Sequence, residues 1–293
     1  MASKQKKKDE GPPVRVLNTP EGVKTEKHDD KNIAKDLQKL MLKLKGEHMT
    51  GDGKNIDYVA LKSSKTYAEY KEKSKALAHV QLESFSEEEK IAFCINVYNA
   101  LTIHGLVEVS GKDLPSSVLD IKQFWKTTGY NIGGHVFSLD HIEHGILRGN
   151  RPHPASQDSP FKQNDPRLKY VVKTVDPRIH FALNCGARSC PAINVYTAEN
   201  LNSALDAAAK AFIDQEVFVN VKVREIRVSR LFQWYRSDFG NMDVDAIRWI
   251  RPYLSKEKAE EMDILLDALE ASGGVNIQYS DYNWKLNKVL PKP

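Results

Sequence analysis

Residues 86–109 read SEEEKIAFCINVYNALTIHGLVEV, and this stretch sets the fold of the 293-residue chain. Ser86 and Glu89 stand three residues apart at its start, which is the capping-box spacing that begins many helices. Apolar side chains follow at Ile91, Ile95, Tyr98, Leu101 and Ile103. We therefore expect one helix over Ser86–Val109, the longest of the chain.

Elements of both kinds surround this helix. Apolar spacing and capping residues predict further helices at Thr197–Asp214, Arg230–Phe239, Val244–Leu254 and Ser255–Ala271. Clusters of β-branched residues predict strands at Val136–Leu139, Tyr170–Val175, Ile179–Leu183, Val217–Val228 and Val275–Tyr279. This order lacks regular βα alternation, so it predicts an α+β fold: a single compact domain with a mixed or antiparallel sheet and about six to eight helices.

The first 28 residues differ in composition from the rest. They hold three prolines and few apolar groups, and seven Lys and Arg against four Asp and Glu give them +3 of the net charge of +4. Such a segment cannot bury enough apolar surface to become ordered, so we expect a disordered basic tail over 1–28 and a globular domain over 29–293.

An amphipathic helix is expected to follow the tail. Asp29 and Asp30 can cap it, and it ends near Gly46. Its apolar positions are Ile33, Leu37, Leu40, Met41 and Leu44. This stripe either packs on the body of the protein or docks a protein partner.

Composition excludes several classes of protein. The body after residue 28 carries only +1, the +4 of the chain less the +3 of the tail, which argues against nucleic-acid binding. No run of 18 or more apolar residues is present, so no membrane span is expected, and no apolar segment follows the basic start as an export signal would require. Three cysteines are too few for a disulfide scaffold, so we expect a cytoplasmic protein.

Residues 179–191, IHFALNCGARSCP, carry the strongest chemical signal. In a strand, His180 and Asn184 share the face that leads to the Cys185 thiol. Gly186 allows the chain to turn sharply directly after Cys185, and Cys190 follows four residues after Gly186. A nucleophilic thiol needs a lowered pKa, which a nearby imidazolium can supply. The alternative is that both cysteines are small buried residues of a turn.

A second segment, residues 133–148, is rich in titratable groups. It holds three histidines and two carboxylates: His135, His141, His144, Asp140 and Glu143. These could bind a metal or orient an imidazole base, but their spacing matches no zinc signature. Zinc would require His144 or His141 to join His180, Cys185 and Cys190. The alternative is a short helix in which Glu143 and Arg148 form salt bridges.

Amides and aromatic rings mark two further helices. Asn96 and Asn99 lie three residues apart on the longest helix, and buried amides require defined partners. Those partners are either a substrate or the carbonyls of a neighbouring loop. The segment Arg230–Phe239 carries Phe232, Trp234, Tyr235, Asp238 and Phe239, for which core packing is expected.

These blocks together resemble the domain of unknown function 547 family. The resemblance runs from about Asp57 to Asn287 and rests on residues 92–101, 142–148, 180–191, 232–239 and 282–287. Cys94 stands where the family commonly has Trp, so we assign it to packing. The family implies no established activity. It implies only that the following residues occupy its motif positions: Asn96, Tyr98, Asn99, Glu143, His144, Arg148, His180, Cys185, Ser189, Cys190 and Pro191.

We expect a cysteine-centred hydrolase or acyl transferase acting on a small-molecule or peptide substrate, without a cofactor. Cys185 is the expected nucleophile, with His180 or His144 as base. An oxyanion donor comes from Asn96 or Asn99, and Glu143 completes the candidate site. One alternative is a noncatalytic interaction module in which these residues form a buried brace. Another is a dithiol redox or zinc site at Cys185 and Cys190.

Overall fold

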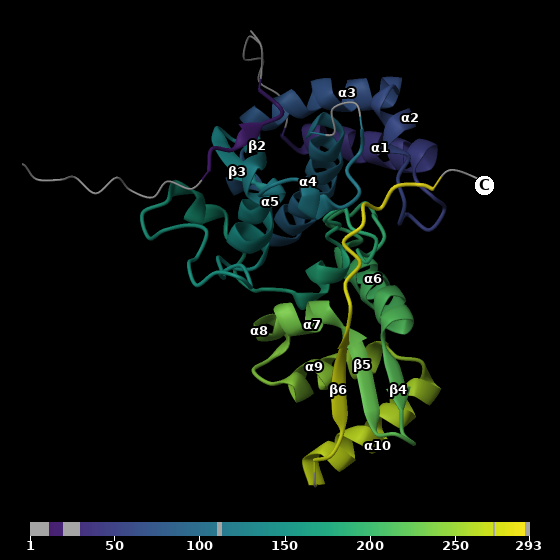
Figure 1. Ribbon diagram of the computed structural model, residues 1–293. Helices are drawn as coiled ribbons and strands as arrows, with labels where there is room; N and C mark the ends of the chain where they lie inside the picture. The colour runs from purple at the N-terminus through teal and green to yellow at the C-terminus, as the bar shows by residue number, and fades with distance from the viewer. Residues whose placement is uncertain (1–11, 20–29, 110–112, 272, 291–293) are drawn as a thin grey trace, which may run out of the picture.

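Two small three-stranded sheets organise the chain, one in each of two lobes (Figure 1). The computed structural model describes residues 12–19, 30–109, 113–271 and 273–290. The first lobe holds most of the helices before residue 200, and the second lobe lies below it in Figure 1, with α6 between them.

The first lobe is built around α4. Its helices are α1 (Asp30–His48), α2 (Tyr58–Lys62), α3 (Lys65–Ser74), α4 (Glu87–Val109) and α5 (Phe124–Thr127). Its sheet pairs β1 (Arg15–Val16) in parallel with β2 (Thr128–Ile132), and β2 antiparallel with β3 (His135–Ser138). Short 3-10 helices occur at η1 (Lys75–His79), η2 (Leu82–Ser84), η3 (Val118–Asp120), η5 (Pro166–Tyr170) and η6 (Pro177–Phe181). A π-helical segment, η4 (His141–Leu147), follows β3.

Helix α4 is long and apolar enough to cross a membrane by length and composition alone. Every residue from Ala92 to Val107 is buried, however, which is the position of a core helix. Its start is the predicted capping box: the Glu89 amide donates to Ser86 Oγ at 3.1 Å, and the Ser86 amide donates to Glu89 Oε2 at 2.8 Å. The long helix predicted from this segment is therefore confirmed.

The second lobe begins at α6 (Leu201–Glu216) and packs helices on a second sheet. Its helices are α7 (Arg230–Trp234), α8 (Arg236–Phe239), α9 (Asp243–Ile250), the 3-10 turn η7 (Arg251–Tyr253) and α10 (Lys256–Ala271). Strand β4 (Phe218–Asn220) pairs antiparallel with β5 (Glu225–Ser229), which pairs in parallel with β6 (Asn276–Ser280). Each lobe has its own hydrophobic core.

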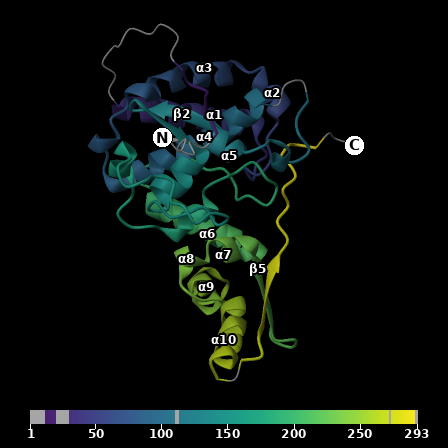
Figure 2. The same ribbon diagram turned by 60° about the vertical axis from the view of Figure 1, so that its left-hand side comes forward.

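The chain after β6 returns to the first lobe. In Figures 1 and 2 this yellow segment continues upward from β6 and reaches the first lobe. Single bridges join Leu286 to Ala187 and Lys288 to Ile56, and the buried Tyr58 hydroxyl donates to Asn287 Oδ1 at 2.7 Å. These contacts hold residues 286–288 beside the first lobe, and Leu286 lies next to the loop that carries Cys185 and Cys190.

The α+β class is confirmed, with ten α-helices in the described ranges, six of them of eight or more residues. Two predicted strands are wrong. Tyr170–Val175 lies at the end of η5, and Ile179–Leu183 lies over η6. Both 3-10 helices begin with Asp-Pro, and in each case the aspartate accepts a hydrogen bond from the amide two residues later. These caps outweigh the β-propensity of the residues that follow.

Two other predicted elements are divided in the structure. Val217–Val228 is the β4–β5 hairpin rather than one strand, and Arg230–Phe239 is the pair of short helices α7 and α8. The single domain expected over residues 29–293 stays a prediction.

Residues 12–19 depart from the expected disordered tail. They contribute β1, and Asn18 is fully buried. Its side-chain amide donates to the carbonyls of Ser74 and Asn131 at 3.0 and 2.9 Å, and its side-chain oxygen accepts from the Asn131 amide at 2.7 Å. The rest of the tail, residues 1–11 and 20–28, lies outside the described residues.

Candidate active site

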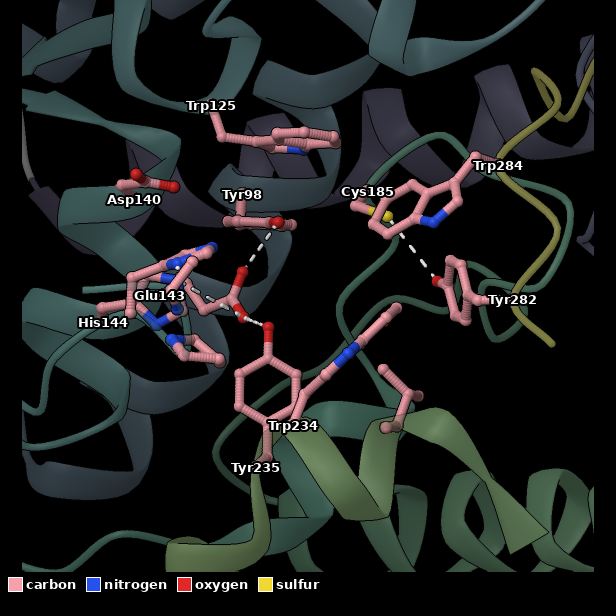
Figure 3. A pocket seen from close by; sticks show the side chains of 14 residues that line it. Tyr98, Trp125, Asp140, Glu143, His144, Cys185, Trp234, Tyr235, Tyr282 and Trp284 are labelled. Atoms are coloured by element: carbon pink, nitrogen blue, oxygen red, sulfur yellow. Dashed lines mark hydrogen bonds and ion pairs between the residues drawn. The ribbon is translucent and has the colours of Figure 1, made fainter. Parts of the chain in front are cut away.

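A cavity of about 420 Å³ lies between the lobes (Figure 3). The first lobe supplies its wall from α4, α5, η4 and the loop after η4, and the second lobe supplies α7. The remaining wall comes from the Cys185 loop and the returning C-terminal segment. The lining side chains are Tyr98, Trp125, Asp140, Glu143, His144, His153, Pro154, Ala155, Cys185, Leu231, Trp234, Tyr235, Tyr282 and Trp284.

Two free thiols meet at one side of this cavity. Cys185 and Cys190 have their Sγ atoms 3.0 Å apart, and the Cys185 backbone amide donates to Cys190 Sγ at 3.2 Å. Cys185 lines the cavity, whereas Cys190 is only 3% exposed behind it. A disulfide bond is about 2.05 Å long, so a small movement of the two sulfurs would allow one to form.

The Tyr282 hydroxyl contacts both sulfurs. It lies 3.2 Å from Cys190 Sγ and 3.7 Å from Cys185 Sγ, and Figure 3 shows it pointing toward Cys185 from the C-terminal segment. Sulfur that accepts several hydrogen bonds is stabilised as a thiolate. Tyr282 therefore links the end of the chain to the chemistry of the thiol pair.

The two thiols differ in acidity. The hydrogen bond with Cys190, together with burial, raises the pKa of Cys185 well above its usual value. Burial opposes ionisation of Cys190 as well, but hydrogen bonds from Cys185 and Tyr282 outweigh it and hold the pKa of Cys190 below its usual value. The pair thus shares a proton, with the negative charge favoured on the buried sulfur. By contrast, burial raises the pKa of Cys94 to about 12, which agrees with a packing role.

Glu143 is held on the opposite side of the cavity. Its carboxylate accepts hydrogen bonds from the Tyr98 hydroxyl at 2.9 Å and the Tyr235 hydroxyl at 2.7 Å. Burial opposes ionisation of Glu143, but hydrogen bonds from the Tyr235 and Tyr98 hydroxyls favour the carboxylate, and its pKa lies below the usual value. Glu143 is therefore a buried, ionised carboxylate in the wall of the cavity.

Asp140 and the two pocket histidines have the opposite character. Burial, with the charge of Glu143, raises the pKa of Asp140 to about 7. Burial lowers the pKa of His144 to about 3 and also lowers the pKa of His153. At neutral pH the cavity thus presents neutral imidazoles, one ionised carboxylate and one carboxyl that can give or take a proton.

Asp238 organises a buried charge network behind the cavity. Its carboxylate accepts from Arg148 Nε at 2.6 Å and Nη2 at 3.0 Å, from Arg151 Nη1 at 2.7 Å, and from His180 Nε2 at 2.8 Å. Arg148 also donates to His144 Nδ1 at 2.9 Å, which fixes the neutral tautomer of that ring. This network joins η4 and η6 of the first lobe to α8 of the second.

Neither candidate base contacts Cys185. Throughout the described ranges, no hydrogen bond joins the Cys185 thiol to an imidazole; its partners are Cys190 and Tyr282. His180 is buried, bonded to Asp238, and stacked on Tyr235 with ring centroids 3.9 Å apart. His144 lines the cavity but is oriented by Arg148.

Asn96 and Asn99 bond to the backbone rather than to the cavity. Asn96 exchanges two hydrogen bonds with the amide and carbonyl of Tyr196, at 2.9 and 2.7 Å. Asn99 donates to the Ala182 carbonyl at 2.9 Å and accepts from the Asn184 amide at 2.8 Å. Asn99 thereby braces the chain just before Cys185, which matches the alternative of a loop-bracing amide.

The zinc set considered as an alternative is not assembled by this geometry. Within the part of the chain that the structure describes, no group of three or more His, Cys, Asp or Glu side chains could hold a metal ion. Of the residues considered for zinc, His180 bonds Asp238, His144 accepts from Arg148, and His141 accepts from the Ser138 amide.

Several site residues were assigned to other roles or missed at the sequence level. Trp234, Tyr235 and Asp238 were expected in core packing but form the cavity wall and the charge network. Trp125 and Tyr282 were not predicted as site residues. Tyr282 is 92 residues from Cys190 in the chain, so no local pattern could have indicated their contact.

The fold and cavity define an α+β protein with a dithiol at a cleft between two lobes. Residues 82–213 match the family model described as protein of unknown function, DUF547, which confirms the resemblance over this range. The match contains α4, η4 and both pocket cysteines but neither α7 nor Tyr282. Comparison with curated proteins and with solved structures gives no match.

Proposed function

We propose that this protein is a thiol–disulfide oxidoreductase whose reacting pair is Cys185 and Cys190. The observation that carries this proposal is the 3.0 Å contact between two free sulfurs, one lining the cavity and one buried behind it. This arrangement supplies an accessible thiol for attack and a second thiol to complete the exchange. The expected cytoplasmic location would keep the pair reduced.

The exchange proceeds in two steps. The negative charge of the reduced pair rests on Cys190, so Cys190 accepts the Cys185 proton along their contact as the Cys185 sulfur attacks one sulfur of a substrate disulfide. The substrate S–S bond breaks, a mixed disulfide forms at Cys185, and the first substrate thiolate leaves and takes a proton from solvent. Cys190 then attacks Cys185 Sγ, which forms the Cys185–Cys190 disulfide and breaks the mixed disulfide, and the proton of Cys190 passes to the second substrate thiolate as it leaves. Two electrons pass from the protein to the substrate.

A second candidate function is the cysteine-centred hydrolase or acyl transferase. The observation in its favour is that Cys185 shares the cavity with His144 and His153. In this function Cys190 would be dispensable, because acyl transfer needs one sulfur only. The two functions therefore differ in what they require of Cys190.

The test uses 4,4′-dithiodipyridine, a neutral aromatic disulfide, with the folded protein. We expect wild type to release two pyridinethione molecules per chain, Cys190→Ser to release one and retain the other on Cys185, and Cys185→Ser to react slowly. Retention of ester hydrolysis by Cys190→Ser would instead support the hydrolase. Failure of all three proteins to react would support a noncatalytic interaction module. Cys94→Ala is the matched control. Because the Cys94 thiol is buried, this substitution should leave the number of pyridinethione molecules released per chain unchanged.

A further inference from the structure

We propose that the cavity recognises an organic ammonium group, so that the disulfides reduced under the proposed function are amine-bearing ones. The reduction of amine-bearing disulfides rests on the proposed function. Recognition of the ammonium group rests on the side chains that line the cavity. Two features of those walls support it: a continuous set of aromatic rings and a buried carboxylate without a cationic partner.

Four aromatic side chains form one side of the cavity. Trp284 lies at the centre of this set, with ring centroids 4.6 Å from Tyr282, 5.6 Å from Trp234 and 5.8 Å from Trp125. All four rings line the cavity and are half-buried. The faces of tryptophan and tyrosine rings carry negative potential, and such a set is the usual way in which proteins bind quaternary and primary ammonium groups.

Glu143 supplies the charge that a cation would balance. Its hydrogen-bond donors are the neutral hydroxyls of Tyr98 and Tyr235. The nearest imidazole nitrogen, of His144, is 4.0 Å from Glu143 Oε1, and burial keeps that ring neutral at pH 7. The buried Arg148 is committed to Asp238. Buried charges are normally paired, so the cavity lacks the cation that Glu143 would normally have.

The remaining charges point the same way. Among the described residues that line the cavity there is no Lys or Arg side chain, and the second acid, Asp140, adds negative charge as it ionises. The exposed Lys126 acts weakly on Asp140 from α5, outside the lining. An anionic ligand would meet one or two carboxylates without a compensating cation, whereas an ammonium group would contact rings and carboxylates together.

Two probes of nearly equal shape test this inference without any variant. Choline carries a quaternary ammonium, and 3,3-dimethylbutan-1-ol replaces its nitrogen by carbon. Three of the four tryptophans line the cavity, so tryptophan fluorescence reports occupancy. We expect choline to bind at least about tenfold more tightly than the alcohol, which is the size of a desolvated cation–π contact. Equal or weaker binding of choline overturns the inference.

Variants locate the effect. Glu143→Gln should bring the ratio of the choline and alcohol affinities close to one while the affinity for the alcohol stays unchanged. Trp284→Leu should lower the affinity for choline more than the affinity for the alcohol. If Glu143→Gln does not fold, the ratio in wild type and in Trp284→Leu still decides the matter. A ratio that both folded variants leave unchanged places the cation elsewhere and contradicts the inference.

The Cys185→Ser/Cys190→Ser double variant separates this inference from the proposed function. It cannot reduce disulfides but should retain the preference for choline. In wild type, cystamine, a diamine disulfide, should be reduced faster than the uncharged 2-hydroxyethyl disulfide. Absence of any reduction together with a preserved choline preference would reject the redox function alone. Reduction of both disulfides at equal rates without a choline preference would reject the ammonium site alone.

Discussion

Removing the charge of Asp238 tests whether the network behind the cavity stabilises the protein. The Asp238 side chain is fully buried and accepts five hydrogen bonds, two of them from Arg148. Asp238→Asn keeps the size of the side chain but leaves the Arg148 guanidinium, itself 2% exposed, without an anion. Breaking a buried ion pair from one side costs about 3–5 kcal/mol, because a charge stays buried without a partner.

The assay is thermal unfolding. At about 2.1 cal/mol/K of unfolding entropy per residue, such a loss lowers the melting temperature by about 5–8 °C in a chain of this length. The matched control is Asp263→Asn, which removes an equally bidentate partner from Arg251 on the surface, where both side chains are 45% exposed. We expect little change there, because exposed pairs are solvated and screened.

The effect should depend on pH with a defined sign. Burial opposes ionisation of Asp238, but His180 and Arg148 outweigh it and depress its folded pKa below the unfolded value of about 3.9. The stabilisation is therefore complete above about pH 5 and falls as the pH drops below about 4 toward the folded pKa. A melting temperature of Asp238→Asn within about 2 °C of wild type at pH 7 would refute the reasoning, since it corresponds to only about 1 kcal/mol.

Three further substitutions give separate predictions. Asn99→Ala leaves two buried backbone groups unpaired and should lower the free energy of unfolding by about 2–5 kcal/mol in urea; a loss below about 1 kcal/mol would contradict the bracing role. Tyr282→Phe removes a hydroxyl that donates to Cys190, so thiolate absorbance at 240 nm should develop at higher pH than in wild type, and an unchanged titration would count against that contact. Gly145→Ala would place its Cβ 2.4 Å from a buried phenylalanine ring and should cost about 1–3 kcal/mol, whereas Gly51→Ala, with no atom within 4 Å, should be nearly neutral; equal effects would refute the packing argument.

Local sequence was sufficient for much of the first lobe. The Ser86–Glu89 spacing located the start of α4, and its apolar positions are buried as one core helix. The Asp-Pro-Arg repeats at 165–167 and 176–178 carried a signal that β-propensity obscured. In each, the aspartate caps a 3-10 helix and also binds the arginine of its own motif. A cap one residue before proline is thus the better guide to these two turns.

The candidate site was only partly predictable. Cys185 and Cys190 lie in one turn, so their proximity follows from five residues of chain. The contacts of Tyr282 and Asp238 do not, because they depend on how the second lobe and the returning C-terminal segment pack on the first. His180 illustrates the same limit. His180 is close enough to Cys185 in the sequence for the two side chains to form a hydrogen bond. In the structure the His180 ring instead bonds to the Asp238 carboxylate, 58 residues away in the chain.

The dithiol is tested most directly by its redox equilibrium. The protein would be equilibrated in dithiothreitol buffers of graded oxidised-to-reduced ratio, quenched in acid, alkylated and mapped by mass spectrometry. The structure predicts one two-electron transition in which Cys185 and Cys190 become joined to each other while Cys94 stays free. Two pocket cysteines that both remain alkylatable at the most oxidising ratio, or that pair with other thiols instead, would contradict the account.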